Sequence, residues 1–157
     1  MAYRILFIIG TFLDWEIEQW DIKSAFTNSP INEEIYVIQP TGLEDIKEPT
    51  KVCRLNKALY GLKQSARQWY NYLKELLEEL GFYPITSDQS IFINQKTNIV
   101  VTSHIDDLLI FSKDKESIKT LKENLSKRVE ITDLGPTSYY LGIEIKRDRS
   151  NRSISLT

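Results

Sequence analysis

The chain has 157 residues, 41% of them hydrophobic, and a formal net charge of −2, with a sequence pI of about 5.5. This length predicts a single domain with a substantial core, and the slightly acidic balance argues against a protein that holds nucleic acid by its own charge, because such a protein must neutralise several phosphates. The apolar run from Ile5 to Leu13 is too short for a membrane span and lacks the cleavage pattern of a signal peptide.

Hydrophobic periodicity and turn residues divide the chain into short strands and amphipathic helices. In chain order we expect a helix over residues 3–13, a strand over 17–22, a helical turn after Lys23, strands over 35–39 and 52–55, a helix over 66–80, strands over 91–94, 99–105 and 108–112, a helix over 115–129, and strands over 130–132 and 139–146. Ser65 is the expected N-cap of the helix over 66–80, and residues 41–50 are the expected loop. Cys53, in the alternating run KVCRL, is expected to be a buried thiol, as in a reducing intracellular setting.

The helix expected over 115–129 has one apolar face, which is typical of a helix packed on a sheet. That face is formed by Ile118, Leu121, Leu125 and Val129. Short strands joined by turns, together with such helices, predict an α+β protein in which an antiparallel sheet carries its helices on one face.

Two β-branched-rich runs meet at an adjacent pair of carboxylates, Asp106 and Asp107, in the segment IVVTSHIDDLLIFS. Both runs predict strands, so the pair is expected at the turn of a hairpin. Hairpin turns favour Asn-Gly, Asp-Gly or Gly-X, and neighbouring carboxylates repel each other, so this pair breaks the local rule. Sites that break such a rule are often functional, and a divalent cation would remove the repulsion.

A third carboxylate, Asp21, ends the strand expected over residues 17–22. Three carboxylates from two strand ends could form a two-metal site that holds the attacking and leaving oxygens of a phosphoryl transfer. That chemistry is used by nucleic-acid polymerases.

Four sequence blocks follow one another from about Ile17 to Lys146: QWDIKSAFTNSPINEEIYVIQPTG, KVCRLNKALYGLKQSARQWY, HIDDLLIFS and DLGPTSYYLGIEI. In their order and spacing, the chain resembles the reverse transcriptase of copia-type LTR retrotransposons. A DD or YGLKQ motif alone would be weak evidence for this family, but four ordered blocks over most of the chain are specific evidence. The resemblance implies the palm of an RNA-directed DNA polymerase, a ferredoxin-like split βαβ fold, encoded within a retrotransposon polyprotein that also serves DNA integration.

The resemblance also implies roles for particular residues. Asp21, Asp106 and Asp107 would be the catalytic carboxylates and the ligands of Mg²⁺ or Mn²⁺. Around them, the implied nucleotide-binding residues are Ile22, Lys23, Ser24, Ala25, Phe26, Tyr60, Gly61 and Lys63. The implied primer-proximal residues are Leu141, Gly142, Ile143 and Glu144.

Three positions keep alternative interpretations. Phe26 is either a core aromatic or the family's steric gate, which packs under the incoming sugar and rejects a 2′-hydroxyl. His104 stands where the family usually has an aromatic residue, and a single histidine on a strand is more often packed and hydrogen-bonded than a ligand. In LYGLKQSARQWY, the apolar stripe that begins at Trp69 predicts a core-facing helix, so only the segment from Tyr60 to Ser65 is expected near nucleotide or template.

The implied partners are an RNA or DNA template with its primer, deoxynucleoside triphosphates and the remainder of the polyprotein, with no membrane. The implied location is intracellular, in a cytoplasmic particle or the nucleus. We expect a single palm domain over residues 1–157, without the family's fingers, thumb, connection and RNase H regions, and hence little activity by itself. Two alternatives remain: a domesticated or decayed palm that acts as an interaction module, and a nucleotide cyclase, which the YGLKQ and YLGIEI blocks disfavour.

Overall fold

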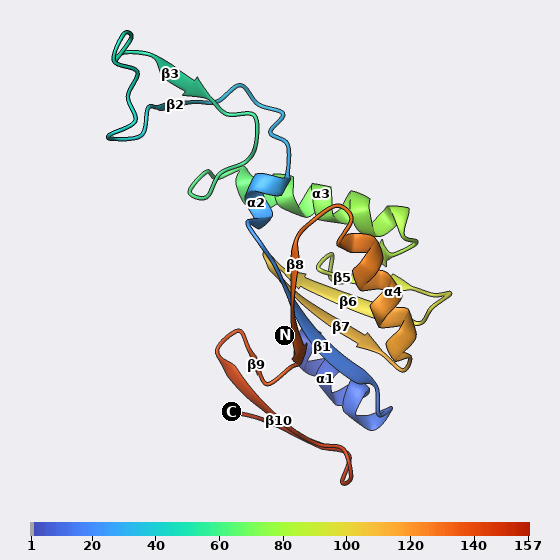
Figure 1. The fold of residues 1–157 in the computed structure, drawn as a ribbon. Coiled ribbons are helices and arrows are strands. Elements are labelled where there is room, and N and C mark those ends of the chain that lie inside the picture. Colours follow the sequence, from blue (N-terminus) through green and yellow to red (C-terminus); the bar gives the residue numbers. More distant parts are fainter. Residues whose placement is uncertain (1) are drawn as a thin grey trace. The chain divides into compact units, whose positions relative to one another are not determined.

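The computed structural model describes residues 2–157 (Figure 1). In chain order, the helices are α1 (Ala2–Phe12), α2 (Ala25–Asn28), α3 (Ser65–Glu79) and α4 (Lys115–Leu125). The strands are β1 (Glu16–Ile22), β2 (Tyr36–Ile38), β3 (Val52–Arg54), β4 (Tyr83–Pro84), β5 (Ile91–Asn94), β6 (Ile99–His104), β7 (Asp107–Ser112), β8 (Ile131–Pro136), β9 (Tyr139–Tyr140), β10 (Ile143–Asp148) and β11 (Ser153–Leu156). Most expected elements therefore occur within a few residues of their predicted ends, whereas β4 and β11 were not expected.

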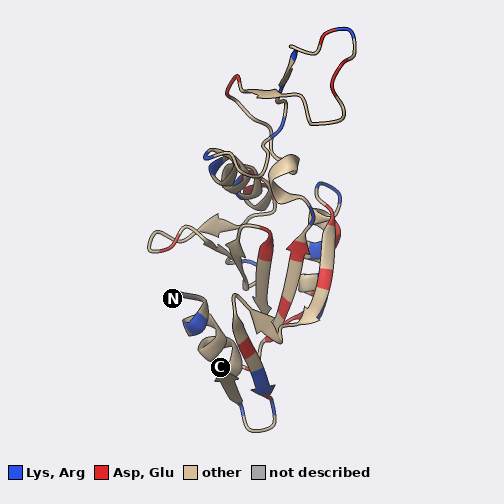
Figure 2. Cartoon of the chain, turned by 90° about the vertical axis from the view of Figure 1, so that its left-hand side faces the viewer, with Lys and Arg blue, Asp and Glu red and all other residues tan. Residues whose placement is uncertain are grey.

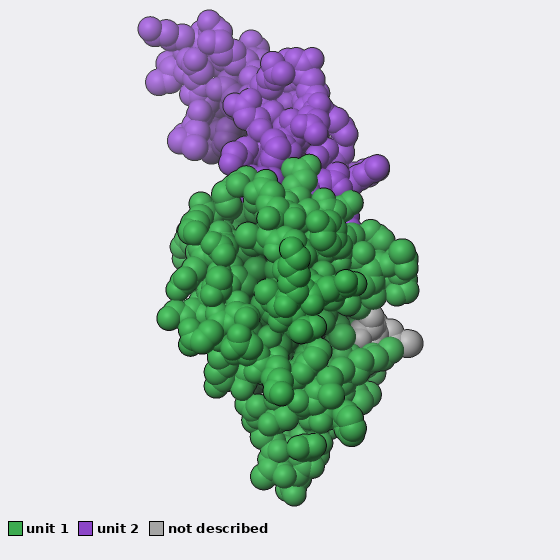
Figure 3. Space-filling model, turned by 90° about the vertical axis from the view of Figure 1, so that its right-hand side faces the viewer, with its two compact units in different colours: residues 1–23, 73–157 green, residues 24–72 purple. Residues whose placement is uncertain are grey.

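The chain forms two compact units (Figure 3). Unit 1 comprises Met1–Lys23 and Leu73–Thr157, and unit 2 comprises Ser24–Tyr72. Within residues 2–157, no helix combines the length and the apolar character needed to cross a bilayer.

Unit 1 is built on a six-stranded sheet with the strand order β4-β5-β6-β7-β1-β8. Every neighbouring pair in this sheet is antiparallel. Strand β1 lies between β7 and β8, so the segment that ends in Asp21 is hydrogen-bonded on both sides. Asp21 and Asp107 thus lie on interior strands of the sheet rather than on an edge.

Helices lie on both faces of this sheet, which differs from the single covered face expected. On one face, Phe7 of α1 packs edge-on against Phe111, with ring centroids 5.7 Å apart. On the other face, α4 contacts β7 and buries Ile118, Leu121 and Leu125 (Figure 1). The physical reason is that α1 has few polar residues on any side. One of its faces can therefore be buried against the apolar surface of the sheet that α4 leaves uncovered.

The segment expected as one strand over residues 139–146 is a hairpin, in which β9 pairs with β10. Leu141 and Gly142 form its two-residue turn, and both have positive φ, at 49° and 82°. Two successive positive φ values are the requirement of a type I′ turn, for which Asn-Gly is the usual sequence. Leu-Gly lacks that signature, which explains why the turn was missed.

Unit 2 contains the two-stranded hairpin of β2 and β3. Cys53 lies on β3 and is exposed, so the expectation of a buried thiol was wrong. All three residues of β3 are exposed, so the alternation in KVCRL reflects strand pairing without burial. The loop between the two strands is organised by Gln39, whose side chain donates to the carbonyls of Glu48 and Lys51 and accepts from the N–H of Asp45.

Ser65 is the first residue of α3 rather than its N-cap. Its hydroxyl bonds the backbone of Leu59, accepting from the N–H and donating to the carbonyl. The serine therefore fixes the preceding loop of unit 2 instead of the helix end.

Candidate active site

Asp21 and Asp107 are direct partners in the antiparallel pair of β1 and β7. The next pair along, Ile22 and Asp106, is joined by a hydrogen bond from the Ile22 N–H to the Asp106 carbonyl, 2.8 Å long. Hydrogen-bonded and non-hydrogen-bonded pairs alternate in an antiparallel ladder, so Asp21 and Asp107 form a non-hydrogen-bonded pair. In such pairs the Cα atoms are only about 4.5 Å apart and the side chains are at their closest.

The turn between β6 and β7 has Ile105 and Asp106 at its centre, because His104 pairs with Asp107. The adjacent carboxylates are therefore divided between the turn and the first position of β7. Ile105 has φ of 55°, a left-handed conformation that is uncommon for a β-branched residue. Backbone strain of this kind clusters at active sites, where the surrounding structure holds it in place.

Repulsion between the carboxylates affects the pKa of Asp21. Burial raises the pKa of Asp21 above its usual value, and the charges of Asp106 and Asp107 raise it further. Like charges directly opposite on neighbouring strands destabilise a sheet. The arrangement thus costs stability in the free protein, as expected for side chains placed for a cation.

The described residues, 2–157, contain no group of three or more His, Cys, Asp or Glu side chains already placed to hold a metal ion. The predicted three-carboxylate ligand set therefore stays a prediction. In chemistry the donors fit a hard divalent cation, which prefers carboxylate oxygens and usually keeps waters or substrate phosphates in its shell.

Gln19, which lies two residues before Asp21 on the same strand, was not among the predicted site residues. Its side-chain amide donates a hydrogen bond to Oδ1 of Asp107, with a nitrogen-to-oxygen distance of 3.3 Å. The two residues are 88 positions apart in sequence. Alternation along β1 places Gln19 on the face of Asp21, but nothing local indicates the contact with Asp107.

The segment after Asp21 is fixed by hydrogen bonds to the β6–β7 turn and to the residue that precedes β8. The N–H of Ile22 is bonded to Asp106, and the N–H of Lys23 donates to the carbonyl of Glu130 at 3.0 Å. The ammonium of Lys23 also forms an ion pair with the Glu130 carboxylate, which raises the pKa of Lys23. Two of the predicted nucleotide-binding residues, Ile22 and Lys23, thus have their backbone N–H groups already hydrogen-bonded within the protein.

In unit 2, two residues expected near the nucleotide contact each other. The rings of Phe26 and Tyr60 have centroids 4.4 Å apart, at an interplanar angle of 53°. Phe26 is buried, whereas Tyr60 is half exposed. Gly61 follows with φ of 93°, which favours glycine, and Lys63 is exposed.

The predicted primer-proximal turn between β9 and β10 and the β6–β7 hairpin that contains the carboxylate pair line the same cavity in unit 1. Leu141 of the β9–β10 turn and His104 of β6 both line a pocket of about 290 Å³, with Tyr140 and Thr102. Burial raises the pKa of Tyr140 to about 12. His104 itself is exposed, so the expectation of a packed histidine was wrong.

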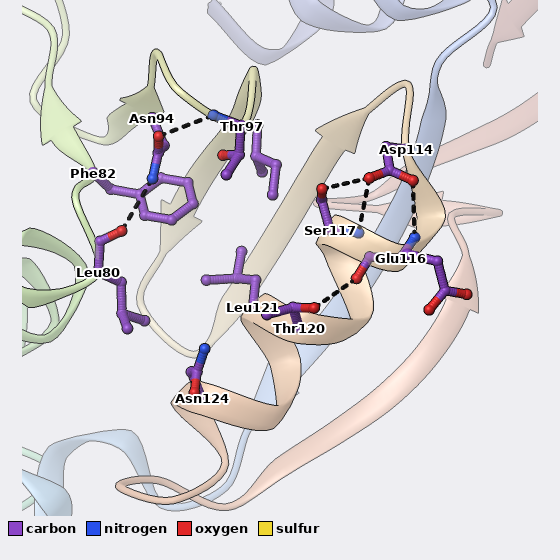
Figure 4. Close-up of a pocket in the computed structure, with 11 residues that line it drawn as sticks. Leu80, Phe82, Asn94, Thr97, Asp114, Glu116, Ser117, Thr120, Leu121 and Asn124 are labelled. Atoms are coloured by element: carbon purple, nitrogen blue, oxygen red, sulfur yellow. Dashed lines mark hydrogen bonds between the residues drawn. The ribbon is translucent and has the colours of Figure 1, made fainter.

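A second pocket of unit 1, of about 260 Å³, lies between α4 and the β5–β6 hairpin (Figure 4). None of the predicted site residues lines it. Its rim is fixed by Asp114, which caps α4 through the N–H groups of Glu116 and Ser117, and by Asn94, which bonds the Leu80 carbonyl. This pocket is therefore separate from the carboxylate site.

Acidic segments recur on the strands of unit 1 (Figure 2). Lys23, the basic residue nearest Asp21 in sequence, is already in an ion pair, and the chain has 20 Lys and Arg against 22 Asp and Glu. The composition of the chain therefore does not provide a strongly basic surface that could bind phosphate groups.

Comparison with known proteins identifies the family. The family model described as reverse transcriptase (RNA-dependent DNA polymerase) matches residues 2–157. The retrovirus-related Pol polyprotein from transposon TNT 1-94 of Nicotiana tabacum is 38% identical over 159 residues, covering 99% of this chain and 12% of that polyprotein. The corresponding polyprotein from transposon RE1 of Arabidopsis thaliana is also 38% identical, over 93% of this chain and 10% of its own length.

Among solved structures, apo telomerase from Candida tropicalis, truncated from its C-terminal domain, aligns with a TM-score of 0.52. At 12% identity over 99% of this chain and 39% of the telomerase chain, this likeness concerns the fold alone. It agrees with the α+β polymerase palm expected from the sequence. The chain spans about a tenth of the length of the Pol polyproteins it matches, and it belongs to the reverse transcriptase (RNA-dependent DNA polymerase) family.

Proposed function

We propose that this chain is the palm of an RNA-directed DNA polymerase that works inside a longer retrotransposon polyprotein. The observation that carries the proposal is the direct pairing of Asp21 with Asp107 on interior strands, beside a strained turn that presents Asp106. Three carboxylates at one end of a rigid sheet suit phosphoryl transfer, in which the protein contributes positioning and electrostatic stabilisation. The proposed location is intracellular, in a particle or the nucleus.

In this proposal, Asp21 and Asp106 are the main ligands of the divalent cation, Mg²⁺ or Mn²⁺, and Asp107 is a further catalytic carboxylate and ligand. When bound, the cation supplies charge neutralisation at the triphosphate and at the primer 3′-oxygen. The chain's own residues orient the reactants. Phe26 would lie beneath the sugar, and Leu141 and Gly142 would lie near the primer strand.

The proposed substrates are deoxynucleoside triphosphates and a primed RNA or DNA template. The slightly acidic composition supports a model in which this chain supplies the carboxylates and the remainder of the polyprotein supplies the basic surfaces that bind phosphates. Substrate binding by the chain alone is accordingly expected to be weak.

Calorimetry with Mn²⁺ tests the metal site. We expect the wild-type chain to bind with a Kd of roughly 1 mM, because substrate phosphates normally complete the coordination shell. The Asp106→Asn, Asp107→Asn double variant should lose this binding. Equal binding by both proteins would exclude the carboxylates as the site.

A non-catalytic interaction module is the second candidate, favoured by the slightly acidic balance of the chain, with 20 Lys and Arg against 22 Asp and Glu. Primer extension on an RNA template distinguishes the polymerase from the interaction module. The assay compares a polyprotein as long as the relatives with the Asp106→Asn variant of the same polyprotein. Extension that depends on Asp106 supports the polymerase. Absence of extension from a folded polyprotein supports the module.

A further inference from the structure

Gln19 and Asp107 form a polar contact that links β1 to β7 on the carboxylate face. Gln19 lies opposite Leu109 in the register, so it reaches Asp107 diagonally across the pair of strands. A carboxylate only accepts hydrogen bonds, so the amide nitrogen of Gln19 must be the atom that faces it. The distance from Nε2 to Oδ1 is 3.3 Å.

The chemistry of this donor matters for a cation site. A lysine or arginine in the same place would neutralise Asp107 and compete with a cation, whereas the neutral amide fixes one oxygen and leaves the negative charge in place. The other oxygen, Oδ2, then keeps a defined direction. A carboxylate that is already held in one orientation loses less side-chain entropy when it binds a cation.

The backbone beside Gln19 is also irregular in a way that suits a placed side chain. Between Glu18 and Trp20, the pairing of β1 with β8 shifts register, since these residues lie opposite Pro136 and Asp133. The extra residue of this bulge is on β8, where Gly135 has φ of 70°. Bulges recur next to active sites, where they change the aim of a side chain.

The strand itself is well anchored. Trp20, the next residue, is fully buried, and Ile17 is buried on the face shared with Gln19. An amide on a rigid interior strand can orient its partner more accurately than one on a loop.

We propose that Gln19 is a positioning residue that orients the carboxylate of Asp107 toward the divalent cation. The proposal rests on the proposed function, because it takes Asp107 to be part of the cation site. Gln19 acts through Asp107.

The contact is tested first in the metal-free chain by NMR of the Gln19 side-chain amide. We expect its resonances to move in the Asp107→Asn variant and to stay in place in Asp45→Asn, which changes an exposed aspartate of unit 2. Unmoved resonances in Asp107→Asn would overturn the proposal whatever the metal does.

The role toward the cation is tested by Mn²⁺ titration of the 157-residue chain. Loss of one hydrogen bond of ordinary strength, as the 3.3 Å distance indicates, predicts a Kd raised roughly 3- to 10-fold in Gln19→Leu. The melting temperature should be little changed, because the substitution keeps the side-chain volume. The control Gln95→Leu, in the exposed β5–β6 turn, should leave the Kd unchanged.

A double-mutant cycle makes the test specific. The effect of Gln19→Leu should disappear in the Asp107→Asn background, since the amide then has no carboxylate to orient. Binding that depends on Asp107 but not on Gln19 would overturn this inference alone. No Mn²⁺ binding by the wild-type chain would overturn the proposed function and, with it, the role of Gln19 toward a cation.

Discussion

The ring of Tyr60 lies against the ring of Phe26, with centroids 4.4 Å apart, although the two residues belong to separate sequence blocks. Tilted aromatic pairs at this distance are favourable beyond the area that they bury. Tyr60 therefore covers the buried Phe26 within unit 2, and the pair gives the YGLKQ block a structural role that its sequence does not reveal.

The pair predicts an energetic coupling. Phe26→Ala should lower the free energy of unfolding by about 3 kcal/mol, as for other buried phenylalanines, and Tyr60→Ala should cost less because Tyr60 is half exposed. The double variant should reveal a coupling of about 0.5–1.5 kcal/mol. Denaturant unfolding of the four proteins measures it, and strictly additive losses would show that the ring contact contributes nothing.

A second prediction concerns sugar selection and needs a polyprotein of the length of the relatives. If Phe26 lies beneath the ribose, a 2′-hydroxyl would clash with the ring, and alanine would remove the clash. Phe26→Ala should then raise ribonucleotide relative to deoxyribonucleotide incorporation by about 10- to 100-fold, which corresponds to roughly 1.4–2.7 kcal/mol. Phe12→Ala, which removes an exposed phenylalanine ring of α1 outside the predicted site, is the control and should leave the ratio unchanged. An unchanged ratio in a folded variant would leave Phe26 with only a packing role.

The third prediction follows from the raised pKa of Asp21. A carboxyl group whose pKa is higher in the folded state than in the unfolded state costs stability above the folded pKa, and this cost disappears as the pH falls below the unfolded value. Burial and the charges of Asp106 and Asp107 raise the pKa here. Asp21→Asn should therefore raise the melting temperature at pH 7 in metal-free buffer, with the gain vanishing toward pH 3.

Glu123→Gln, an exposed change of the same charge on α4, is the control for the third prediction and should give no comparable gain. Addition of Mn²⁺ should reduce the advantage of Asp21→Asn, because only the wild-type carboxylate gains from the cation. A lower melting temperature for Asp21→Asn at pH 7 would contradict the electrostatic account.

Much of unit 1 was predictable because its signals are local. The apolar face of α4 has the period of a helix, the run before the carboxylate pair is rich in β-branched residues, and the run after it is largely apolar. The position of Asp21 at a strand end was also evident. The sequence predicted only that carboxylates from two strand ends could form one site, and the direct pairing of β1 with β7 is contained in no local pattern.

The features that were missed depend on contacts between distant residues or on unusual backbone. Gln19 reaches Asp107 across two strands, and a glutamine on a strand has no property that reveals its partner. The β9–β10 turn uses Leu141 at positive φ, against the preference of its side chain. Exposure of Cys53 depends on the absence of burial along β3, which alternation alone cannot distinguish from a half-buried strand.

The last prediction concerns the strained turn at Ile105, whose φ of 55° is unfavourable for a β-branched residue. Asparagine adopts this left-handed conformation more readily, because its short polar side chain can bond the local backbone. Ile105→Asn should therefore stabilise the chain by about 0.5–1 kcal/mol, a part of the roughly 1–2 kcal/mol that a left-handed residue costs. Little packing is lost, since Ile105 is 44% exposed.

Thermal unfolding compares this variant with Ile46→Asn, which makes the same exchange at a residue that is 98% exposed. The control should change stability by less than about 0.5 kcal/mol, as surface substitutions usually do. If Ile105→Asn instead destabilises the chain, the isoleucine side chain must contribute more to the hairpin than its strain costs. If it stabilises the chain while weakening Mn²⁺ binding, the strain at Ile105 helps to hold Asp106 in place, and the turn exchanges stability for the placement of a carboxylate.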